Sequence, residues 1–267
     1  MSHSTTHAAI SVPVAAWRLW RVLRHVMAGY LTIRFTFPRL DQKERQARVA
    51  DWAGRLVALS GGALRVLGLE HARPDWWHST MVVGNHISWL DIHALHVVCP
   101  ARFVAKSEIS RWPLIGPMTD ASRAIYVERH RRRDVARINS LVADALRHGD
   151  CISVFPEGTT SYGDELLPFH ANLFDAVLRD NLIAEVPALT VRPFTLRYLT
   201  PEGQLTRAPS YVGAQNLLDS MWQTLRGGAF VLELNFLPPL AFDSSMKRRE
   251  LARLTQARIA KALGLTA

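Results

Sequence analysis

Hydrophobic side chains recur at helical spacing through the first 60 residues. Segment 41–60 opens with charged residues, and its later apolar side chains share one helical face (Val49, Trp52, Leu56 and Leu59). Gly61 and Gly62 then end the helix. Segment 10–37 also has helical periodicity, although arginines interrupt its apolar run. The pattern therefore predicts two amphipathic helices ahead of residue 70.

Beyond residue 70 the pattern changes to short apolar runs separated by turns. CISV at 151–154 lacks polar alternation, which is typical of a parallel strand buried on both faces. Pro and Gly in 111–117 predict a loop. Strands are expected within 63–77, 79–85, 102–108, 123–129, 151–158, 186–199 and 230–238, and helices within 88–98, 131–150, 172–181 and 246–265.

This order of elements predicts an α/β fold. A mixed, largely parallel sheet should be flanked by helices and preceded by the N-terminal amphipathic two-helix segment. The change of pattern near residue 70 divides the chain into a helical segment, 1–70, and an α/β domain, 71–267.

The first helix has the composition of a helix that lies in a membrane interface. Its arginines argue against both a secretory signal and a spanning helix of about 20 uncharged residues. Arg18, Arg21 and His25 share a face that could contact lipid headgroups. Apolar side chains surround that face (Trp17, Trp20, Leu23, Met27 and Leu31). The alternative is a helix packed on the protein's own core, and the membrane interpretation is preferred because Trp with Arg is unusual on a core-facing helix.

The chain is basic, with 32 Lys and Arg against 23 Asp and Glu in 267 residues and a formal net charge of +9. That balance favours a polyanionic surface, either anionic lipid or nucleic acid. The aromatic residues do not interleave with the basic runs and no nucleic-acid-binding motif is visible, so we expect no nucleic acid. A non-enzymatic basic module is the alternative of another class. Cys99 and Cys151 lie in apolar runs, as buried reduced thiols would.

Residues 84–91, GNHISWLD, place a histidine and an aspartate five positions apart after an apolar strand. Ser88 and Asp91 could form a capping box at the start of the next helix, with His86 incidental. The position also suits catalysis, because open α/β sheets bind ligands beyond the carboxyl ends of their strands. Asp91 could hold one ring nitrogen of His86 and leave the other as a general base.

A metal site is another interpretation of this segment, because His93 and His96 lie close to His86 and Asp91 in the sequence. No HExxH motif occurs and neither cysteine has metal-ligand spacing. We therefore expect His93 and His96 to be ordinary helix residues, and no metal in the site.

Two later segments could bind a ligand at the same edge of the sheet. Arg129 follows the end of a strand at Val127, and the basic run after it opens a helix, where an arginine is unfavourable unless an anion binds there. Arg131, Arg132 and Arg133 suit a solvated cluster instead. Glu157 follows the buried strand and could accept from substrate hydroxyls, with Gly158 allowing close approach of the backbone. An exposed turn is the alternative for Glu157.

Together these segments resemble a known family. NHISWLD, IYVER and FPEGT, followed by VPA at 186–188, are similar to the four ordered blocks of the glycerolipid acyltransferases. That family includes bacterial 1-acylglycerol-3-phosphate acyltransferases and lyso-ornithine lipid acyltransferases. The resemblance spans roughly residues 60–240 and includes a specific combination, H-x4-D followed by FPEGT. The two N-terminal helices resemble the family's membrane-anchoring pair.

The resemblance implies an α/β acyltransferase domain at 71–267, with His86 as general base and Asp91 orienting it. The substrate-binding residues that it implies are Arg129 for the acceptor headgroup, Glu157, Gly158 and Thr159 for the acceptor site, and Pro187 for the acyl donor. The family transfers acyl groups directly from acyl carrier protein (acyl-ACP) or coenzyme A (acyl-CoA), without a metal, other cofactor or acyl-enzyme. We therefore expect a peripheral or monotopic protein on the cytoplasmic face of the inner membrane, acting on a lysophospholipid.

The sequence departs from the family pattern at two basic positions. Thr160 stands where many members with a glycerophosphate acceptor have arginine, and His170 stands where lysine or arginine is usual. This form is similar to a subgroup that includes lyso-ornithine lipid acyltransferases. Because Arg129 and the basic run remain, we expect 1-acyl-sn-glycerol-3-phosphate as the acceptor, with lyso-ornithine lipid as the alternative.

Overall fold

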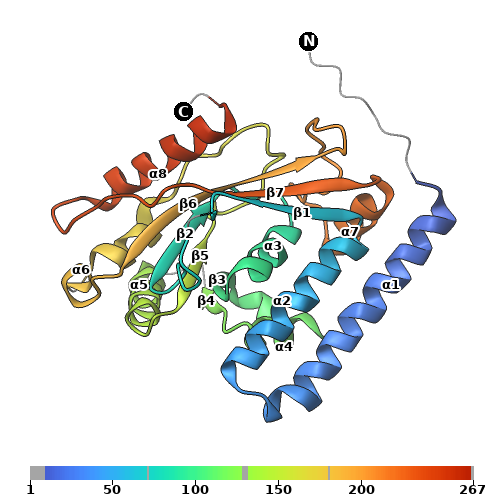
Figure 1. The fold of residues 1–267 in the computed structure, drawn as a ribbon, viewed down its shortest axis with the longest axis horizontal. Coiled ribbons are helices and arrows are strands. Elements are labelled where there is room, and N and C mark those ends of the chain that lie inside the picture. The colour runs from blue at the N-terminus through green and yellow to red at the C-terminus, as the bar shows by residue number, and fades with distance from the viewer. Residues whose placement is uncertain (1–9, 71, 128–131, 180, 266–267) are drawn as a thin grey trace.

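The computed structural model describes residues 10–70, 72–127, 132–179 and 181–265. Strands in this described part of the chain are β1 (Gly62–Leu67), β2 (Thr80–Gly84), β3 (Ala101–Lys106), β4 (Ile125–Val127), β5 (Cys151–Val154), β6 (Thr190–Leu199) and β7 (Phe230–Phe236). They form one sheet in the order β1-β7-β6-β2-β5-β3-β4 (Figure 1). Neighbouring strands are parallel except β6 and β7, which are antiparallel. The expected mixed, largely parallel sheet is confirmed.

Helices flank this sheet and precede it. The α-helices are α1 (Val12–Leu31), α2 (Gln42–Leu59), α3 (Leu90–Val98), α4 (Ile115–Ala121), α5 (Arg132–Arg147), α6 (Leu182–Glu185), α7 (Leu217–Arg226) and α8 (Arg248–Leu263). Shorter turns are η1 (Thr32–Thr36, a π-helix) and the 3₁₀ helices η2 (Phe37–Arg39), η3 (Ser107–Arg111) and η4 (Ala171–Leu178).

Several of these elements differ from the sequence prediction, and three of the differences are informative. The predicted loop at 111–117 contains the start of α4, because Pro117 lies in the first turn, where a helix needs no N–H from it. The helix expected at 172–181 is the 3₁₀ helix η4. No element was predicted at α7, which Asn216 caps by accepting from the Asp219 N–H at 2.9 Å.

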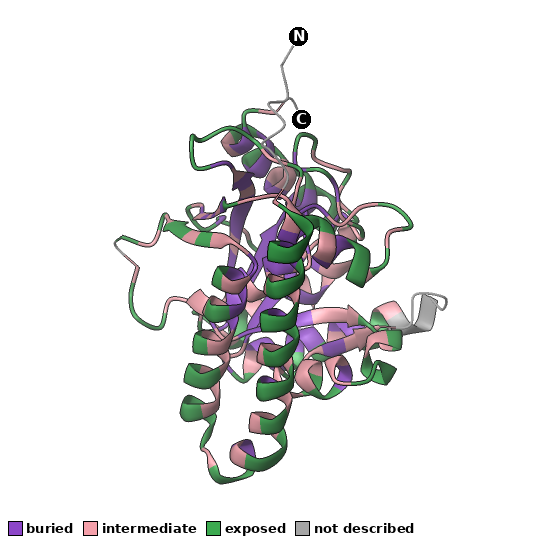
Figure 2. Ribbon diagram, turned by 90° about the vertical axis from the view of Figure 1, so that its right-hand side faces the viewer, coloured by how far each residue is buried: buried purple, intermediate pink, exposed green. Residues whose placement is uncertain are grey.

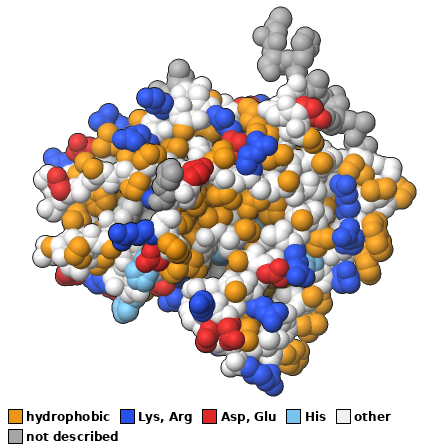
Figure 3. Space-filling view, viewed as in Figure 1, with side chains coloured by type: hydrophobic (Ala, Val, Ile, Leu, Met, Phe, Trp, Pro, Cys, Tyr) orange, Lys and Arg blue, Asp and Glu red, His pale blue; other side chains and the backbone are white. Residues whose placement is uncertain are grey.

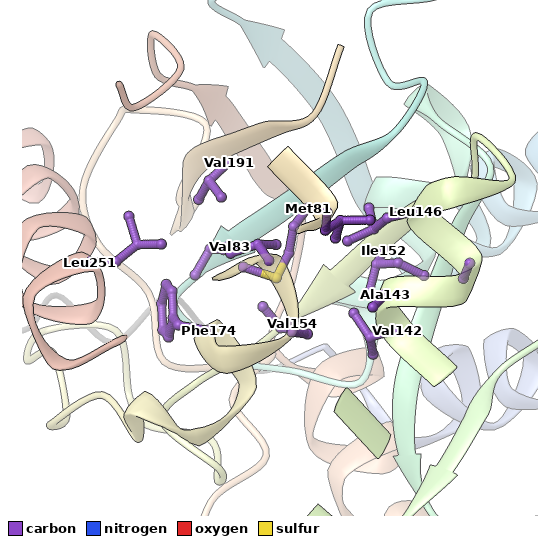
Figure 4. Close-up of a cluster of buried hydrophobic side chains, with 14 of the residues drawn as sticks. Met81, Val83, Val142, Ala143, Leu146, Ile152, Val154, Phe174, Val191 and Leu251 are labelled. Atoms are coloured by element: carbon purple, nitrogen blue, oxygen red, sulfur yellow. The ribbon is translucent and has the colours of Figure 1, made fainter. Parts of the chain in front are cut away.

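The central strands are buried on both faces, as the run CISV predicted. Met81 and Val83 of β2 pack with α5, η4 and α8 in one hydrophobic cluster, which also contains Ile152 and Val154 (Figure 4). Val82 points to the opposite face and packs with α3. Side chains alternate along a strand, so two cores sandwich the same strands.

The first strand belongs to the sheet although it precedes residue 70. Gly62 to Leu67 pair in parallel with Phe230 to Asn235 of β7. Residues on both sides of the expected boundary therefore contribute to one sheet.

α1 and α2 form a helical hairpin at one side of the sheet (Figure 1). Asp41 and Glu44 form a capping box at the start of α2, with both bonds at 2.8 Å. Gly29 of α1 lies against Trp52 of α2, and a Cβ at Gly29 would come within 2.4 Å of the indole nitrogen. Glycine at this position therefore lets the two helices approach closely.

Part of the α1 surface that the sequence analysis assigned to lipid headgroups faces the rest of the protein instead. Arg18 donates to the Leu225 carbonyl at 3.5 Å, and His25 bonds the Trp52 carbonyl at 2.9 Å and stacks on the Trp52 ring. The predicted contact of this face with lipid headgroups is therefore wrong for Arg18 and His25, which bond backbone carbonyls of neighbouring helices. Arg21 is exposed.

The outer surface of α1 is exposed along its length (Figure 2), and at this edge of the molecule hydrophobic side chains alternate with arginines (Figure 3). The exposed side chains of this outer stripe are Val12, Val14, Trp17, Trp20, Leu23, Met27, Leu31 and Phe35. Among the described helices, none combines the length and the apolar character needed to cross a bilayer.

Candidate active site

The turn after β2 is anchored before the chain reaches His86. Asn85 is fully buried, and its side-chain amide exchanges two hydrogen bonds with the backbone of Leu196, at 2.8 and 3.1 Å. These bonds continue the β2–β6 ladder beyond the end of the strand. Gly84 packs under the Phe194 ring, where a Cβ would come within 2.2 Å of a ring atom. The carboxyl end of β2 therefore holds His86 in a defined place.

Asp91, in the first turn of α3, orients His86. Its Oδ2 lies 2.7 Å from His86 Nδ1, and it also accepts from the N–H groups of Ile87 at 2.7 Å and Ser88 at 2.9 Å. The carboxylate is fully buried. Both sequence interpretations therefore hold in part, since Asp91 binds the backbone of the turn and the imidazole together. Ser88 caps the helix start as the capping box predicts, because its N–H donates to Asp91 and its Oγ accepts from the Leu90 N–H at 3.3 Å, although the regular part of α3 begins at Leu90.

The environment of His86 leaves one ring nitrogen available. A carboxylate only accepts, so Nδ1 donates in this bond, and in the neutral imidazole Nε2 then holds the lone pair. The ring stacks on Phe155, with centroids 4.1 Å apart and planes 11° apart. The side chain is 21% exposed, so solvent or a substrate can reach it. An imidazole held in this way can act as a general base.

Glu157 joins the loop after β5 to the His86 turn. Its Oε1 accepts from the His86 N–H at 2.8 Å and its Oε2 from the Leu167 N–H at 3.0 Å. The side chain is buried, so the exposed-turn alternative is wrong. Burial raises the pKa of Glu157 to about 7, although both backbone bonds oppose this shift. Both oxygens bind the protein itself, and contact with substrate hydroxyls stays a prediction.

Gly158 and the two threonines after it shape the same loop. Gly158 has a φ of +71°, which glycine adopts without strain, and its N–H donates to the Phe155 carbonyl at 3.1 Å. Thr159 is exposed beside it. The Thr160 hydroxyl donates to the Tyr211 carbonyl, so this position links two loops and supplies no positive charge.

The structure describes one of the other two predicted binding residues, Pro187, and does not bring it to His86. Pro187 is exposed and precedes β6, whose first residue, Thr190, pairs with the first residue of β2. His86 follows the other end of β2, about 15 Å away along the strands. The role of Pro187 at the acyl donor stays a prediction, and Arg129 lies outside the described residues.

The sequence analysis did not predict the contacts that Tyr198 and Tyr211 make with the His86–Asp91 turn. The Tyr198 hydroxyl donates to Asp91 Oδ1 at 2.7 Å from β6, and the Tyr211 N–H donates to the Ile87 carbonyl at 2.9 Å. Tyr198 belongs to an apolar strand pattern, so nothing local distinguishes it from a core residue. Tyr211 acts through its backbone, which no side-chain motif records.

His93 and His96 are packing residues of α3. His93 meets Trp52 and Trp89 edge-on, and His96 bonds the Ala101 carbonyl at 3.1 Å. Burial lowers the pKa of His93 to about 3 and that of His96 to about 4. Within the described ranges, no three His, Cys, Asp or Glu side chains converge to hold a metal ion.

The cysteines are buried and free, as predicted, with their sulfur atoms 3.9 Å apart. Cys151 begins β5, and the hydrogen bond to the neighbouring Cys99 thiol, together with burial, raises its pKa. A raised pKa disfavours the thiolate, so Cys151 does not suit a nucleophile.

The fold and the site define a class of α/β enzyme in which an oriented histidine lies at the carboxyl edge of a largely parallel sheet. A family model described as Acyltransferase matches residues 63–195, a range that includes His86, Asp91 and Glu157. The chain belongs to this acyltransferase family.

Two kinds of acyltransferase are among the relatives that this chain resembles. The chain is 37% identical to a 1-acyl-sn-glycerol-3-phosphate acyltransferase of Neisseria gonorrhoeae over 68% of its own length and 70% of that protein. It is 31% identical to a lyso-ornithine lipid O-acyltransferase of Pseudomonas aeruginosa over 90% of its length and 88% of that protein. A solved structure, the 1-acyl-sn-glycerophosphate acyltransferase of Thermotoga maritima, shares the fold with a TM-score of 0.64 and 17% identity, covering 92% of this chain and 96% of that one.

Proposed function

We propose that this acyltransferase moves a fatty acyl group from an acyl thioester, acyl-ACP or acyl-CoA, to the free hydroxyl of a lysophospholipid. The preferred acceptor is 1-acyl-sn-glycerol-3-phosphate, and the product is then phosphatidic acid. The observation that carries this proposal is the 2.7 Å bond between His86 and buried Asp91, in a chain that belongs to the acyltransferase family.

In the proposed reaction, His86 Nε2 removes the proton of the acceptor hydroxyl as that oxygen attacks the thioester carbonyl. Asp91 keeps Nδ1 protonated and stabilises the imidazolium that forms. Collapse of the tetrahedral intermediate breaks the C–S bond, and the imidazolium proton goes to the leaving thiolate. A base of this kind contributes about 10²–10⁴-fold, so positioning of the two substrates must supply more. The transfer is direct and uses no metal, other cofactor or acyl-enzyme.

Two observations bear on the acceptor. The Neisseria relative is named for a phosphorylated acceptor, and Arg129 with the following basic run could bind its phosphate. Lyso-ornithine lipid is the second candidate, because Thr160 replaces a cation in the site loop and the Pseudomonas relative matches over most of both chains. The Thr160 hydroxyl is already used by the Tyr211 carbonyl, so it adds nothing to a phosphate site.

The outer stripe of α1 and η1 supports attachment to a membrane surface. Its tryptophans and aliphatic side chains can enter the boundary between headgroups and acyl chains, with Arg21 and Arg24 beside them. The protein would then act as a peripheral or monotopic enzyme. Because acyl-ACP or acyl-CoA would be its donor, the proposed side of the membrane is the cytoplasmic face.

The first experiment measures acyl transfer from a labelled acyl thioester to lysophosphatidate and to lyso-ornithine lipid, side by side. His86→Ala should abolish product, whereas His148→Ala, an exposed histidine of the α5 end, should retain it. Product from lysophosphatidate alone supports the proposal. Product from lyso-ornithine lipid alone keeps the reaction and replaces the acceptor. Full activity of His86→Ala would refute the proposed base.

The second experiment tests the headgroup contact. Arg129→Ala should raise KM for lysophosphatidate much more than KM for lyso-ornithine lipid, because only the former offers a phosphate to the guanidinium. Arg253→Ala, an exposed residue of α8, controls for the loss of one positive charge. Equal changes in KM for the two acceptors would contradict a phosphate contact at Arg129.

A further inference from the structure

We propose that Tyr198 is a positioning residue that sets how readily the His86–Asp91 pair takes up a proton. The inference rests on the proposed role of His86 as the base. It adds a third member to the pair, contributed by β6, a strand distant in sequence from the H-x4-D block.

The contact is short and fully enclosed. The Tyr198 hydroxyl donates to Asp91 Oδ1 at 2.7 Å, and the exposed fractions of Tyr198 and Asp91 are 1% and 0%. The Tyr198 ring packs near Phe230, with centroids 5.6 Å apart, inside the same core as α3. A side chain held in this way keeps its hydroxyl aimed at the carboxylate.

The two oxygens of Asp91 have separate donors. Oδ2 accepts from His86 Nδ1 and from the N–H groups of Ile87 and Ser88, whereas Oδ1 accepts from Tyr198. Tyr198 therefore holds the carboxylate plane from the side opposite His86. If the hydroxyl were removed, Oδ1 would stay buried but would lose the hydrogen bond that Tyr198 donates to it.

Tyr198 is a constant donor over the pH range in which enzymes of this kind are assayed. Burial, followed by the charge of Asp91 and the hydrogen bond to it, raises the pKa of Tyr198 well above its usual value. The phenol therefore stays protonated throughout that range. It draws electron density from the carboxylate, which weakens the attraction between Asp91 and an imidazolium at His86.

Removal of the phenol should consequently make His86 more basic. In Tyr198→Phe the ring still fills its place in the core. The Asp91 carboxylate no longer accepts the phenol hydrogen bond, so its negative charge favours the imidazolium more strongly. The acidic limb of the kcat/KM profile should move to higher pH, since His86 must be neutral to act. Glu157 accepts from the His86 N–H and has a pKa of about 7, but it is the same in both proteins, so the difference between their profiles reports the loss of the phenol. A purely structural role would lower the rate at every pH and leave the limb in place.

The test compares full-length wild type with Tyr198→Phe in two measurements. One is kcat/KM against pH, and the other is a ¹⁵N-histidine NMR titration in which His86→Ala assigns the His86 signals. Tyr126→Phe is the matched control, because it removes a phenol–aspartate bond of 2.6 Å, to Asp120, at the β4 edge of the sheet. The control should leave the His86 titration unchanged.

The outcomes separate this inference from the proposed function. A higher His86 pKa in Tyr198→Phe supports the inference, and an unchanged His86 titration in a folded variant overturns it. Activity in His86→Ala would refute the proposed base, a result that the NMR titration does not depend on. If Tyr198→Phe fails to fold, 3-fluorotyrosine labelling in the Tyr126→Phe background replaces it, because a more acidic phenol is a stronger donor. The His86 titration should then move to lower pH, and no movement would overturn the inference.

Discussion

Replacing Asp91 by two different residues should separate its structural contacts from its chemistry. Asparagine can place its amide oxygen where Oδ2 lies, so it still accepts from Ile87, Ser88 and His86. Its NH₂ group then faces the Tyr198 oxygen, which can accept as well as donate. Alanine offers none of these contacts.

The structure supplies a magnitude for each variant. Asp91→Ala leaves two buried N–H groups and the Tyr198 hydroxyl without their acceptor, and each such group costs about 1–3 kcal/mol. The free energy of unfolding should fall by about 3 kcal/mol or more, out of a typical total of about 5–15 kcal/mol. Asp91→Asn should lose much less stability. It loses the charge that stabilises the imidazolium, about 1.5–3 kcal/mol, so kcat should fall about 10- to 100-fold.

Urea unfolding, followed through tryptophan fluorescence, measures the stability of each variant, since the chain contains eight tryptophans. Acyl transfer at saturating acceptor measures kcat. If Asp91→Ala unfolds at the same urea concentration as Asp91→Asn, Asp91 does not hold the turn. If Asp91→Asn keeps wild-type kcat, the carboxylate charge plays no part in the reaction.

Three further predictions follow from burial and exposure. Burial raises the pKa of Glu157 from 4.5 to about 7, so its contribution to stability is complete below pH 4.5 and is lost as pH rises through 7, by up to about 3 kcal/mol. When the free energy of unfolding in urea is measured against pH, Glu157→Gln should lack this loss of stability. An unchanged pH dependence would contradict the raised pKa of Glu157. Burial lowers the pKa of His93 from 6.5 to about 3, so the contribution of the neutral imidazole to stability is complete above pH 6.5 and is lost as pH falls towards 3. His93→Phe should therefore resist acid unfolding, monitored by tryptophan fluorescence, better than wild type. The double substitution Trp17→Ser and Trp20→Ser should weaken the affinity for anionic vesicles, measured by co-sedimentation, by about 30- to 1,000-fold, at about 1–2 kcal/mol for each half-exposed ring. Leu218→Ser on α7 is the control and should leave the affinity unchanged. Equal losses of affinity would argue that the outer stripe does not bind the membrane.

Much of the fold follows from local patterns in the sequence. The two N-terminal helices, the strands and the buried character of CISV were predictable, because periodicity records which faces are apolar. The elements that were predicted wrongly were also misread from local sequence patterns. Pro117 indicated a loop although the first turn of a helix accepts proline, and α7 gave no pattern that we recognised.

The chemistry of the site divides in the same way. His86 and Asp91 could be paired from sequence, because a strand end and one helical turn bring them together, and the spacing of the blocks identified the family. The orientation of α1 could not be predicted, since the choice of inward face depends on the carbonyls of Trp52 and Leu225. Neither could the separation of Pro187 from His86, which depends on strand register.

Tyr198 and Glu157 show most clearly what only the tertiary structure decided. Tyr198 lies 107 positions beyond Asp91, and Glu157 lies 71 positions beyond His86, yet both make bonds shorter than 3 Å to this turn. Sequence patterns specify which residues are apolar or polar along one element. They do not specify which strand lies next to which, and that neighbourhood determines the partner of a buried polar group, because such a group must find its hydrogen bond inside the fold.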